Sequence, residues 1–334
     1  MASDRFVVIT SINGPHPRLC EFLDLDYSLV VVGDSKTDDA AWRHLDSRAT
    51  YLSLDDQERL FPTLSRALGA GTYARKNLGY LWAIREGAKV IWETDDDTFP
   101  RKEVGDPLVH LSESRHWQLA SEGVTSWNPY TFYAPGSGIW PRGYDTRHIA
   151  RDRHREWLTL PAAFTGSWPR VLQMLVNREP DVDAMYRLTV SSGESDFPPS
   201  TDVIHLNPSV RTPGNTQATI WTDPNLFEYL YVPRWISFRF SDIAKMYVLQ
   251  AVASLAYAGF LMEQVRNPHD LMVDMVQEFP VYEYAPQVVD LTYVLEPQTV
   301  SDAYAALAQL GICGPEDVET SRIFSEEVHA LLAR

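Results

Sequence analysis

The segment AKVIWETDDD, residues 88–97, carries the pattern on which the expected fold depends. Its apolar part is typical of a buried β-strand, and it ends abruptly in the carboxylates Asp95, Asp96 and Asp97. Because side chains alternate along a strand, we expect Asp95 and Asp97 to share one side and Asp96 to face the other. Two carboxylates on one side, at the carboxyl end of a strand, suit a hard divalent cation. A solvated acidic turn is the alternative.

The residues before this segment predict further strands and one helix. Apolar β-type runs predict strands at residues 6–10, 27–34, 49–52 and 89–93. Residues 73–87 predict a helix with an apolar stripe, ended by Gly87. This alternation predicts an α/β fold with a mostly parallel sheet and right-handed crossovers.

The second half of the chain is less regular. Residues 128–233 are dense in Pro, Gly, Trp and Tyr, which indicates the loop-rich acceptor side of a cleft or an irregular lid. Helices are expected further on, at residues 241–265, 270–279, 302–310 and 321–332. We therefore expect an α/β domain over residues 1–242 and a C-terminal helical region over residues 243–334, packed on that domain.

Composition narrows the function classes. The formal net charge of −16 argues against nonspecific nucleic-acid binding, which depends on phosphate neutralisation by Lys and Arg. Cys20 and Cys313 lie far apart without a metal-type pattern, so a reduced cytoplasmic compartment is expected. The N-terminus does not resemble a signal peptide, and the most apolar long segment, residues 248–262, is short for a bilayer and typical of a buried helix. These features predict a chain without a membrane anchor.

Four polar side chains in the first half could contact a ligand. Asp34 ends the second strand and could accept hydrogen bonds from a ribose hydroxyl or a base imino group, or could simply cap the turn. Lys36 could meet a phosphate or pair with Asp34. Arg75 and Lys76 begin the expected helix, where backbone amides and cations suit a diphosphate or a sugar.

Further candidates lie in the second half. Arg142, within WPRGY, and the mixed segment 181–187 place Arg beside aromatic and acidic residues; such sets hold sugars or form surface ion pairs. Asp242 could act as a general base, a sugar ligand or a helix cap, and Arg239 could hold it ionised. His269 could bind the same cation as the aspartates, although a lone His is more often structural.

Several of these segments resemble, in the same order, those of a known family. Between about Val31 and Glu283 the chain resembles the glycosyltransferase-like STELLO family. The resemblance rests on YARKNLGYLWAI, GAK, ETDDD, NPY, IWPRGY, PDVDAMYRLT, FRFSDI and RNPHD, which begin at residues 73, 87, 93, 128, 139, 180, 238 and 266. A more distant resemblance links the chain to the plant reversibly glycosylated polypeptides, which are UDP-arabinopyranose mutases.

Both resemblances imply a GT-A-type fold, in which an α/β sheet binds a nucleotide-sugar and acceptor elements follow. The first hypothesis is a metal-dependent glycosyltransferase that uses a nucleoside-diphosphate sugar, in particular a UDP-sugar, and an acceptor that is a glycan or a small molecule. In that hypothesis Asp95, Asp97 and His269 would bind Mn²⁺ or Mg²⁺, and Asp242 would be the catalytic base. The donor would be contacted by Asp34, Lys36, Arg75, Lys76, Asp96 and Arg239.

Two alternatives remain open. The first is a nucleotide-sugar mutase that interconverts ring forms through a transient sugar adduct on Arg142, the residue that corresponds to the glycosylated Arg of the mutases. The second is a noncatalytic partner that keeps the fold and scaffolds other enzymes. The three aspartates weigh against the scaffold, because a scaffold has no need to concentrate carboxylates at a cleft.

Overall fold

The structure is a computed structural model, and it describes residues 3–43, 46–111, 113–120, 124–164, 166–191, 193–265 and 270–334. The chain forms two compact units, each assembled from segments that are distant in sequence. Unit 1 contains Met1–Phe99, Thr216–Ile236 and Pro297–Arg334, and unit 2 contains Pro100–Asn215 and Ser237–Glu296. This division differs from the expected boundary at residue 242, because Pro297–Arg334 belongs to unit 1 and Ser237–Glu296 belongs to unit 2.

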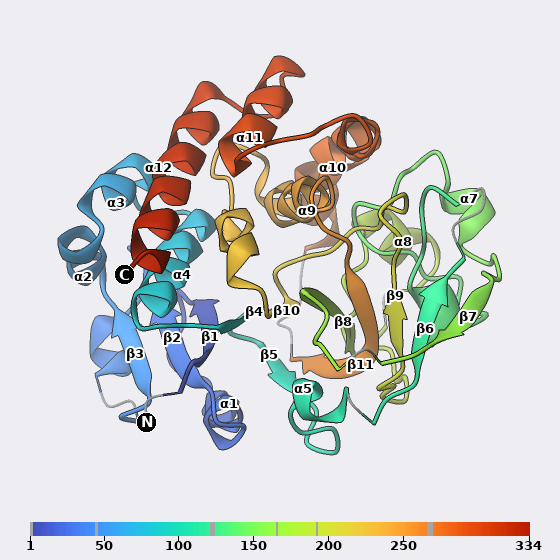
Figure 1. Cartoon of the computed structure of the whole chain (residues 1–334), viewed down its shortest axis with the longest axis horizontal. Helices are drawn as coiled ribbons and strands as arrows, with labels where there is room; N and C mark the ends of the chain where they lie inside the picture. The colour runs from blue at the N-terminus through green and yellow to red at the C-terminus, as the bar shows by residue number, and fades with distance from the viewer. Residues whose placement is uncertain are drawn as a thin grey trace. The chain divides into compact units, whose positions relative to one another are not determined.

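Unit 1 is built on a sheet with the strand order β3-β2-β1-β4-β10 (Figure 1). Its first four strands in this order are parallel, and β10 runs antiparallel to β4. The central strands are buried along almost their whole length, as expected for a parallel sheet covered on both faces. Their bounds are β1 Arg5–Thr10, β2 Ser28–Val32, β3 Ala49–Leu52, β4 Val90–Thr94 and β10 Ala218–Trp221.

Helix α4 packs directly on β1 and β2 (Figure 1). Gly79 permits this close approach, because a Cβ at that position would lie 2.6 Å from side-chain atoms of Val8 and of Val32. The helical segments in the N-terminal part of unit 1 are η1 Pro17–Leu19, α1 Cys20–Asp24, η2 Asp39–Trp42, α2 Leu54–Leu60, α3 Pro62–Leu68, η3 Tyr73–Arg75 and α4 Lys76–Arg85.

The C-terminal helices return to unit 1. Helix α11 (Val300–Gln309) packs on α12 (Pro315–Leu332), which also contacts α3 and α4. The buried carboxylate of Asp317 accepts hydrogen bonds from the backbone amides of Arg234 and Trp235, just after η4 (Pro224–Leu230). One side chain of α12 thereby binds a backbone segment that lies 82 and 83 positions earlier in the sequence.

Unit 2 contains a mixed sheet with the strand order β8-β11-β9-β6-β7. The pairs β8–β11 and β6–β9 are parallel, whereas β9–β11 and β6–β7 are antiparallel. Its strands are β6 His116–Leu119, β7 Thr159–Ala162, β8 Val171–Asn177, β9 Val203–His205 and β11 Ala256–Gln264. Its helices are α5 Pro107–His110, α6 Tyr130–Tyr133, α7 Ile149–Asp152, α8 Ala184–Thr189, α9 Phe238–Leu249 and α10 Leu271–Thr292; the short strand β5 Thr98–Pro100 spans the boundary between the units.

The expected α/β class, the mostly parallel sheet and the C-terminal helices are confirmed. The helix predicted over residues 241–265 is wrong: α9 ends at Leu249, and residues 256–264 form β11. For the same reason residues 248–262 are not one buried helix. Nearly every residue of β11 is buried, so its sequence is a continuous apolar run that periodicity cannot distinguish from a helix.

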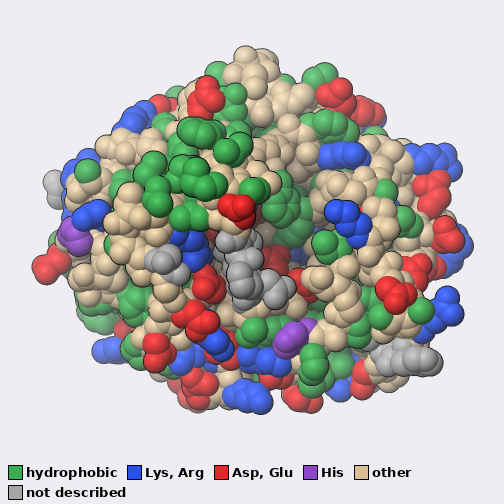
Figure 2. Space-filling model, turned by 180° about the vertical axis from the view of Figure 1, so that it is seen from behind, with side chains coloured by type: hydrophobic (Ala, Val, Ile, Leu, Met, Phe, Trp, Pro, Cys, Tyr) green, Lys and Arg blue, Asp and Glu red, His purple; other side chains and the backbone are tan. Residues whose placement is uncertain are grey.

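Two further observations concern membrane-spanning helices and surface charge. Among the described residues, none forms a helix with both the length and the apolar character that a membrane crossing would require. On the face drawn in Figure 2, acidic and basic side chains are intermixed.

Candidate functional site

The three aspartates follow β4 in a turn. The strand ends at Thr94, and Asp96 and Asp97 belong to the turn that leads to Thr98. Strand alternation therefore does not determine where the three side chains point. Each carboxylate is oriented by its own neighbours instead.

Asp95 faces the start of α4. Its Oδ1 accepts a hydrogen bond from the Tyr73 hydroxyl at 2.8 Å and lies 3.5 Å from Nζ of Lys76. Although 31% of the Asp95 side chain is exposed, the protein packed around it raises the pKa of its carboxyl to about 6. Lys76 opposes this rise, and the neighbouring charge of Asp97 adds to it.

Asp96 faces the loop that follows β1. Its Oδ2 accepts hydrogen bonds from the Ser11 hydroxyl and, at 3.0 Å, from the Asn13 side-chain amide. Asp97 accepts a hydrogen bond from the hydroxyl of Thr98 at 3.2 Å. The turn after β4 is therefore tied to the carboxyl end of the parallel strand beside it.

Asp34 follows β2 and holds the Gly69–Thr72 loop. Its carboxylate accepts hydrogen bonds from the backbone amides of Gly71 at 2.7 Å and Thr72 at 2.8 Å, as well as from Ser35. The turn-forming alternative for Asp34 is thus visible in these contacts, while contact with a nucleoside stays a prediction. Lys36 lies on the exposed surface two residues later.

Arg75 and Lys76 point into unit 1. The Arg75 guanidinium donates to the side chains of Gln57 and Ser65 and to a backbone carbonyl, and only 2% of the residue is exposed. Lys76 is fully buried and donates to the Tyr73 hydroxyl and to the Thr94 carbonyl. Lys76 therefore contacts Asp95 directly and also through the Tyr73 hydroxyl. Arg75 connects α2 and α3 to the start of α4. Contact of either residue with a donor stays a prediction.

In unit 2, Arg142 lies between two carboxylates. Its guanidinium donates to both oxygens of Asp181, at 2.8 and 3.1 Å, and to both oxygens of Asp242, at 3.2 and 2.9 Å. Burial lowers the pKa of Arg142, but the charges of Asp181 and Asp242 outweigh this and raise that pKa well above its ordinary value. The fifth contact of the guanidinium is the backbone carbonyl of Arg239. Arg142 therefore forms a fully hydrogen-bonded ion triad.

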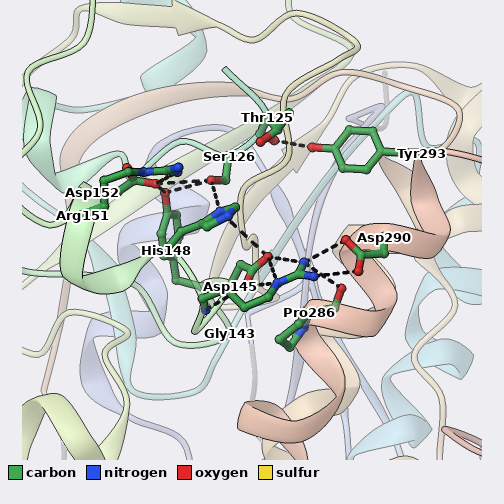
Figure 3. A network of polar contacts seen from close by, with 12 residues as sticks. Thr125, Ser126, Gly143, Asp145, His148, Arg151, Asp152, Pro286, Asp290 and Tyr293 are labelled. Carbon is green, nitrogen blue, oxygen red and sulfur yellow. Dashed lines mark hydrogen bonds and ion pairs between the residues drawn. The ribbon is translucent and has the colours of Figure 1, made fainter. Parts of the chain in front are cut away.

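The sequence after Arg142 fixes this triad in place. Gly143 has a φ of +80°, and a Cβ there would lie 2.4 Å from Ile243 in α9, so only glycine fits. Beyond it, Asp145 pairs with Arg147, which also pairs with Asp290 of α10 at 2.8 Å. Figure 3 labels Asp145 and Asp290 within this network. The segment from Arg142 to Arg147 thereby contacts two helices of unit 2, α9 and α10.

Asp242 occupies the first turns of α9 and is not its cap. The N-cap position is Ser237, and Asp242 is the fifth residue of the helix. Only 12% of its side chain is exposed. The arginine that faces Asp242 is Arg142, because the Arg239 side chain pairs with Asp274 of α10. Arg142 contacts both oxygens of Asp242, and a role of Arg239 toward Asp242 stays a prediction.

His269 lies outside the described residues, so its place as a metal ligand stays a prediction. In the part of the chain that is described, no three His, Cys, Asp or Glu side chains gather as a metal site. Two participants were not predicted: Tyr73, which contacts Asp95 from 22 positions away, and Thr216, which contacts Tyr73 from 143 positions away. Tyr73 adjoins the Arg75-Lys76 pair in the sequence, but nothing local to Thr216 marks it.

Comparison with known proteins identifies relatives by sequence. No model of a known protein family matches the chain. Two proteins of Arabidopsis thaliana do match: "Probable glycosyltransferase STELLO1", 26% identical over 355 residues and 98% of this chain, and "Probable glycosyltransferase STELLO2", 26% identical over 263 residues and 73% of this chain. The chain spans 45% and 33% of the length of these two relatives.

Solved structures give weaker likenesses. A mycobacterial protein has a TM-score of 0.41 at 10% identity, covering 88% of this chain and 76% of that one. Glucosyl-3-phosphoglycerate synthase of M. tuberculosis has a TM-score of 0.35 at 11% identity, covering 88% and 81%. A mannosyltransferase of Pyrobaculum calidifontis, solved with GDP-Man and Mn²⁺, has a TM-score of 0.36 at 12% identity, covering 99% and 87%.

The sequence matches are the informative result, since they extend over most of the chain. They include the strand that carries the three aspartates and the segments around Arg142 and Asp242, because one match covers 98% of the chain. The predicted resemblance is thereby confirmed: over most of its length, the chain is similar to the glycosyltransferase-like STELLO family.

Proposed function

We propose that the chain is a metal-dependent glycosyltransferase that takes its sugar from a nucleoside-diphosphate sugar, in particular a UDP-sugar. The sequence relatives, both named as probable glycosyltransferases, support a glycosyltransferase. In this proposal Asp95 and Asp97 bind Mn²⁺ or Mg²⁺. The acceptor is a glycan or a small molecule. A GT-A-type arrangement and a cytoplasmic location stay predictions that accompany this function.

One observation carries the proposal: polar groups from three strand ends converge at one edge of the unit 1 sheet. Asp34 follows β2, Ser11 follows β1, and Asp95 follows β4, all at the carboxyl ends of parallel strands. Asp96 binds Ser11, and the Asp34-bound loop leads to Tyr73, which binds Asp95. Ligands of open α/β sheets bind at this kind of edge.

The residues at this edge fit a divalent cation that is shared with a ligand. Asp95 and Asp97 lie two positions apart at the turn after β4, where a cation would relieve the repulsion between their charges. Two carboxylates are also the usual protein contribution to a Mg²⁺ site, whose remaining ligands are water and substrate phosphate oxygens. The cation, when bound, would stabilise the diphosphate as a leaving group. Asp96, tied to the β1 loop, would keep the turn in position.

Calorimetry with UDP, with and without Mn²⁺, tests the proposal. We expect Mn²⁺ to tighten UDP binding by about tenfold or more in the wild-type chain, because the cation neutralises the diphosphate. The variant Asp95→Asn/Asp97→Asn should lose this Mn²⁺ effect. A matched control, Asp4→Asn/Asp24→Asn, changes two exposed aspartates elsewhere in unit 1 and should behave as wild type. Unchanged Mn²⁺-dependent binding in Asp95→Asn/Asp97→Asn would refute the proposed site, and a titration with GDP compares the nucleosides.

The contacts of Arg142 favour a transferase over the mutase. An arginine that attacks a sugar must present an unprotonated nitrogen, yet Arg142 uses its guanidinium to bind Asp181 and Asp242, and only 9% of its side chain is exposed. Intact-protein mass spectrometry after incubation with a UDP-sugar distinguishes the two. An added sugar that disappears in Arg142→Lys would reverse our preference.

Slow hydrolysis of the sugar donor distinguishes a noncatalytic scaffold from both kinds of enzyme. An active donor site should release the sugar from a UDP-sugar to water at a slow, Mn²⁺-dependent rate even without its acceptor. We propose that Asp242, held beside Arg142, is the acceptor base. Hydrolysis that is absent with every UDP-sugar and GDP-sugar tried would favour the scaffold.

A further inference from the structure

The Tyr73 hydroxyl contacts three polar side chains of unit 1. It lies 2.8 Å from Oδ1 of Asp95, 2.7 Å from the hydroxyl of Thr216, and 2.8 Å from Nζ of Lys76, which donates to it. Lys76 is fully buried, so its ammonium depends on Tyr73, Asp95 and the Thr94 carbonyl for its partners. One phenol oxygen thus links a buried cation to one of the proposed metal ligands.

The contacts of Asp95 are one-sided. Among the described residues, its hydrogen bond from Tyr73 and its ion pair with Lys76 both involve Oδ1. A carboxylate held through one oxygen keeps its rotation fixed and leaves the other oxygen to a ligand. Groups that hold a metal-binding carboxylate in this way usually govern the affinity of the site, although they do not touch the ion.

Tyr73 is itself held on both sides along the backbone. The amide of Thr72 donates to Asp34, and the hydroxyl of Thr72 accepts a hydrogen bond from the amide of Ala74 at 3.2 Å. Tyr73 therefore begins η3 from a fixed loop rather than from a free one. The carboxyl end of β2 reaches Asp95 through this loop.

From these contacts we propose that Tyr73 is a positioning residue: it orients the carboxylate of Asp95 to bind the divalent cation, and Asp34 fixes the loop that presents it. The inference rests on the proposed function, because it requires a cation at Asp95 and Asp97. It adds a residue that neither contacts the cation nor belongs to the acidic turn.

The test is Mn²⁺ binding followed by electron paramagnetic resonance, in which free Mn²⁺ is counted directly in the presence of UDP. Tyr73→Phe removes only the hydroxyl, and we expect Mn²⁺ affinity to fall by about tenfold, as for other groups that orient a metal ligand. Tyr80→Phe is the matched control: Tyr80 lies in α4, and its hydroxyl also donates to a carboxylate, that of Glu93 in β4. Tyr80→Phe should lower the melting temperature and leave Mn²⁺ affinity unchanged.

The outcomes separate this inference from the function beneath it. If the wild type binds Mn²⁺ through Asp95 and Asp97 but Tyr73→Phe binds it equally well, the positioning role is refuted and the proposed function stands. If the wild type binds no Mn²⁺, both are refuted. If circular dichroism shows that Tyr73→Phe does not fold, Thr216→Val is used instead, because it removes another partner of the Tyr73 hydroxyl. We expect Thr216→Val to bind Mn²⁺ several-fold more weakly. Unchanged Mn²⁺ affinity in Thr216→Val would count against the proposal.

Discussion

The two units hold acidic clusters of similar composition in different surroundings. In unit 1 three consecutive carboxylates lie at a strand end next to one buried ammonium, Lys76, and 31% of the Asp95 side chain is exposed. In unit 2 Asp181 and Asp242 enclose Arg142, and their side chains are 16% and 12% exposed. In the first cluster three carboxylates share one ammonium and Asp95 is partly exposed, whereas in the second both carboxylates bind one guanidinium and are largely buried.

The difference indicates separate roles for the same residue types. A partly exposed cluster in which three carboxylates share one ammonium can accept a further cation. A buried triad with bidentate contacts fixes geometry, and breaking it leaves a buried charge without its partner. We therefore expect changes in unit 1 to alter ligand binding and changes around Arg142 to alter turnover and stability.

The largest effect is expected at Asp242. If Asp242 is the acceptor base, Asp242→Asn should lower the transfer rate by roughly two to four orders of magnitude and leave UDP and Mn²⁺ affinity nearly intact. Asp181→Asn is the matched control, because it weakens an ion pair of the same arginine, Arg142, without removing the proposed base. It should lower the turnover far less. Equal losses in the two variants, measured as kcat on one acceptor, would assign both residues to structure alone.

The next effect concerns stability. Arg142→Met leaves Asp181 and Asp242 buried without their counter-charge and should lower the free energy of unfolding by about 3–5 kcal/mol. Lys76→Met should cost less, because Asp95 is partly exposed and can be hydrated. Urea denaturation of the two variants measures the contrast. Equal destabilisation would show that the two clusters do not differ in the way described.

A third prediction concerns pH and the C-terminal helices. Burial raises the pKa of Asp317 to about 6, and the amides of Arg234 and Trp235 oppose this rise. The folded state then holds a proton that the unfolded state has released, so this residue's contribution to stability is lost as pH rises from about 4 to about 6. The loss is of the order of 3 kcal/mol or less.

Asp317→Asn cannot release this proton. We expect the variant to show a smaller fall in the free energy of unfolding between pH 4 and pH 7 than the wild type. Denaturation curves at several pH values check the slope, and an identical slope in both proteins would remove Asp317 from the account.

The smallest effect is expected at Asp34. Asp34→Ala removes the acceptor for the amides of Gly71 and Thr72, each worth about 1 kcal/mol. Hydrogen exchange at these two amides should accelerate several-fold, while exchange in α4 stays unchanged. If exchange is unaffected but UDP affinity falls, Asp34 reads the nucleoside, as first predicted, and does not hold the loop.

Much of unit 1 could be predicted from sequence because its elements are local and regular. The β4 strand is a continuous apolar run with an acidic end, and residues 73–87 carry a helical stripe, so both appear close to their expected bounds. Unit 2 was harder. The buried strand β8 lies in the segment expected to be loop-rich, and the residues of β11 predict part of a helix, because fully buried strands carry no alternation.

The candidate site shows the same limit. The aspartate triplet marks the edge of the sheet by itself, since its three residues are adjacent. The Arg142 triad joins residues that are 39 and 100 positions apart, and no local pattern reveals such a grouping. Likewise, no local pattern reveals that the side chains of Arg75 and Lys76 are buried, because their burial depends on how η3 and α4 pack within unit 1.

The most direct test of the central claim is the position of Mn²⁺ in crystals grown with UDP and Mn²⁺. Anomalous scattering locates the ion without assumptions about its ligands. Our account predicts one Mn²⁺ with carboxylate oxygens of Asp95 and Asp97 at coordination distance, roughly 2.0–2.6 Å, and with the UDP diphosphate completing its shell. A Mn²⁺ peak away from these aspartates, or UDP bound in unit 1 with no ion beside them, would contradict it.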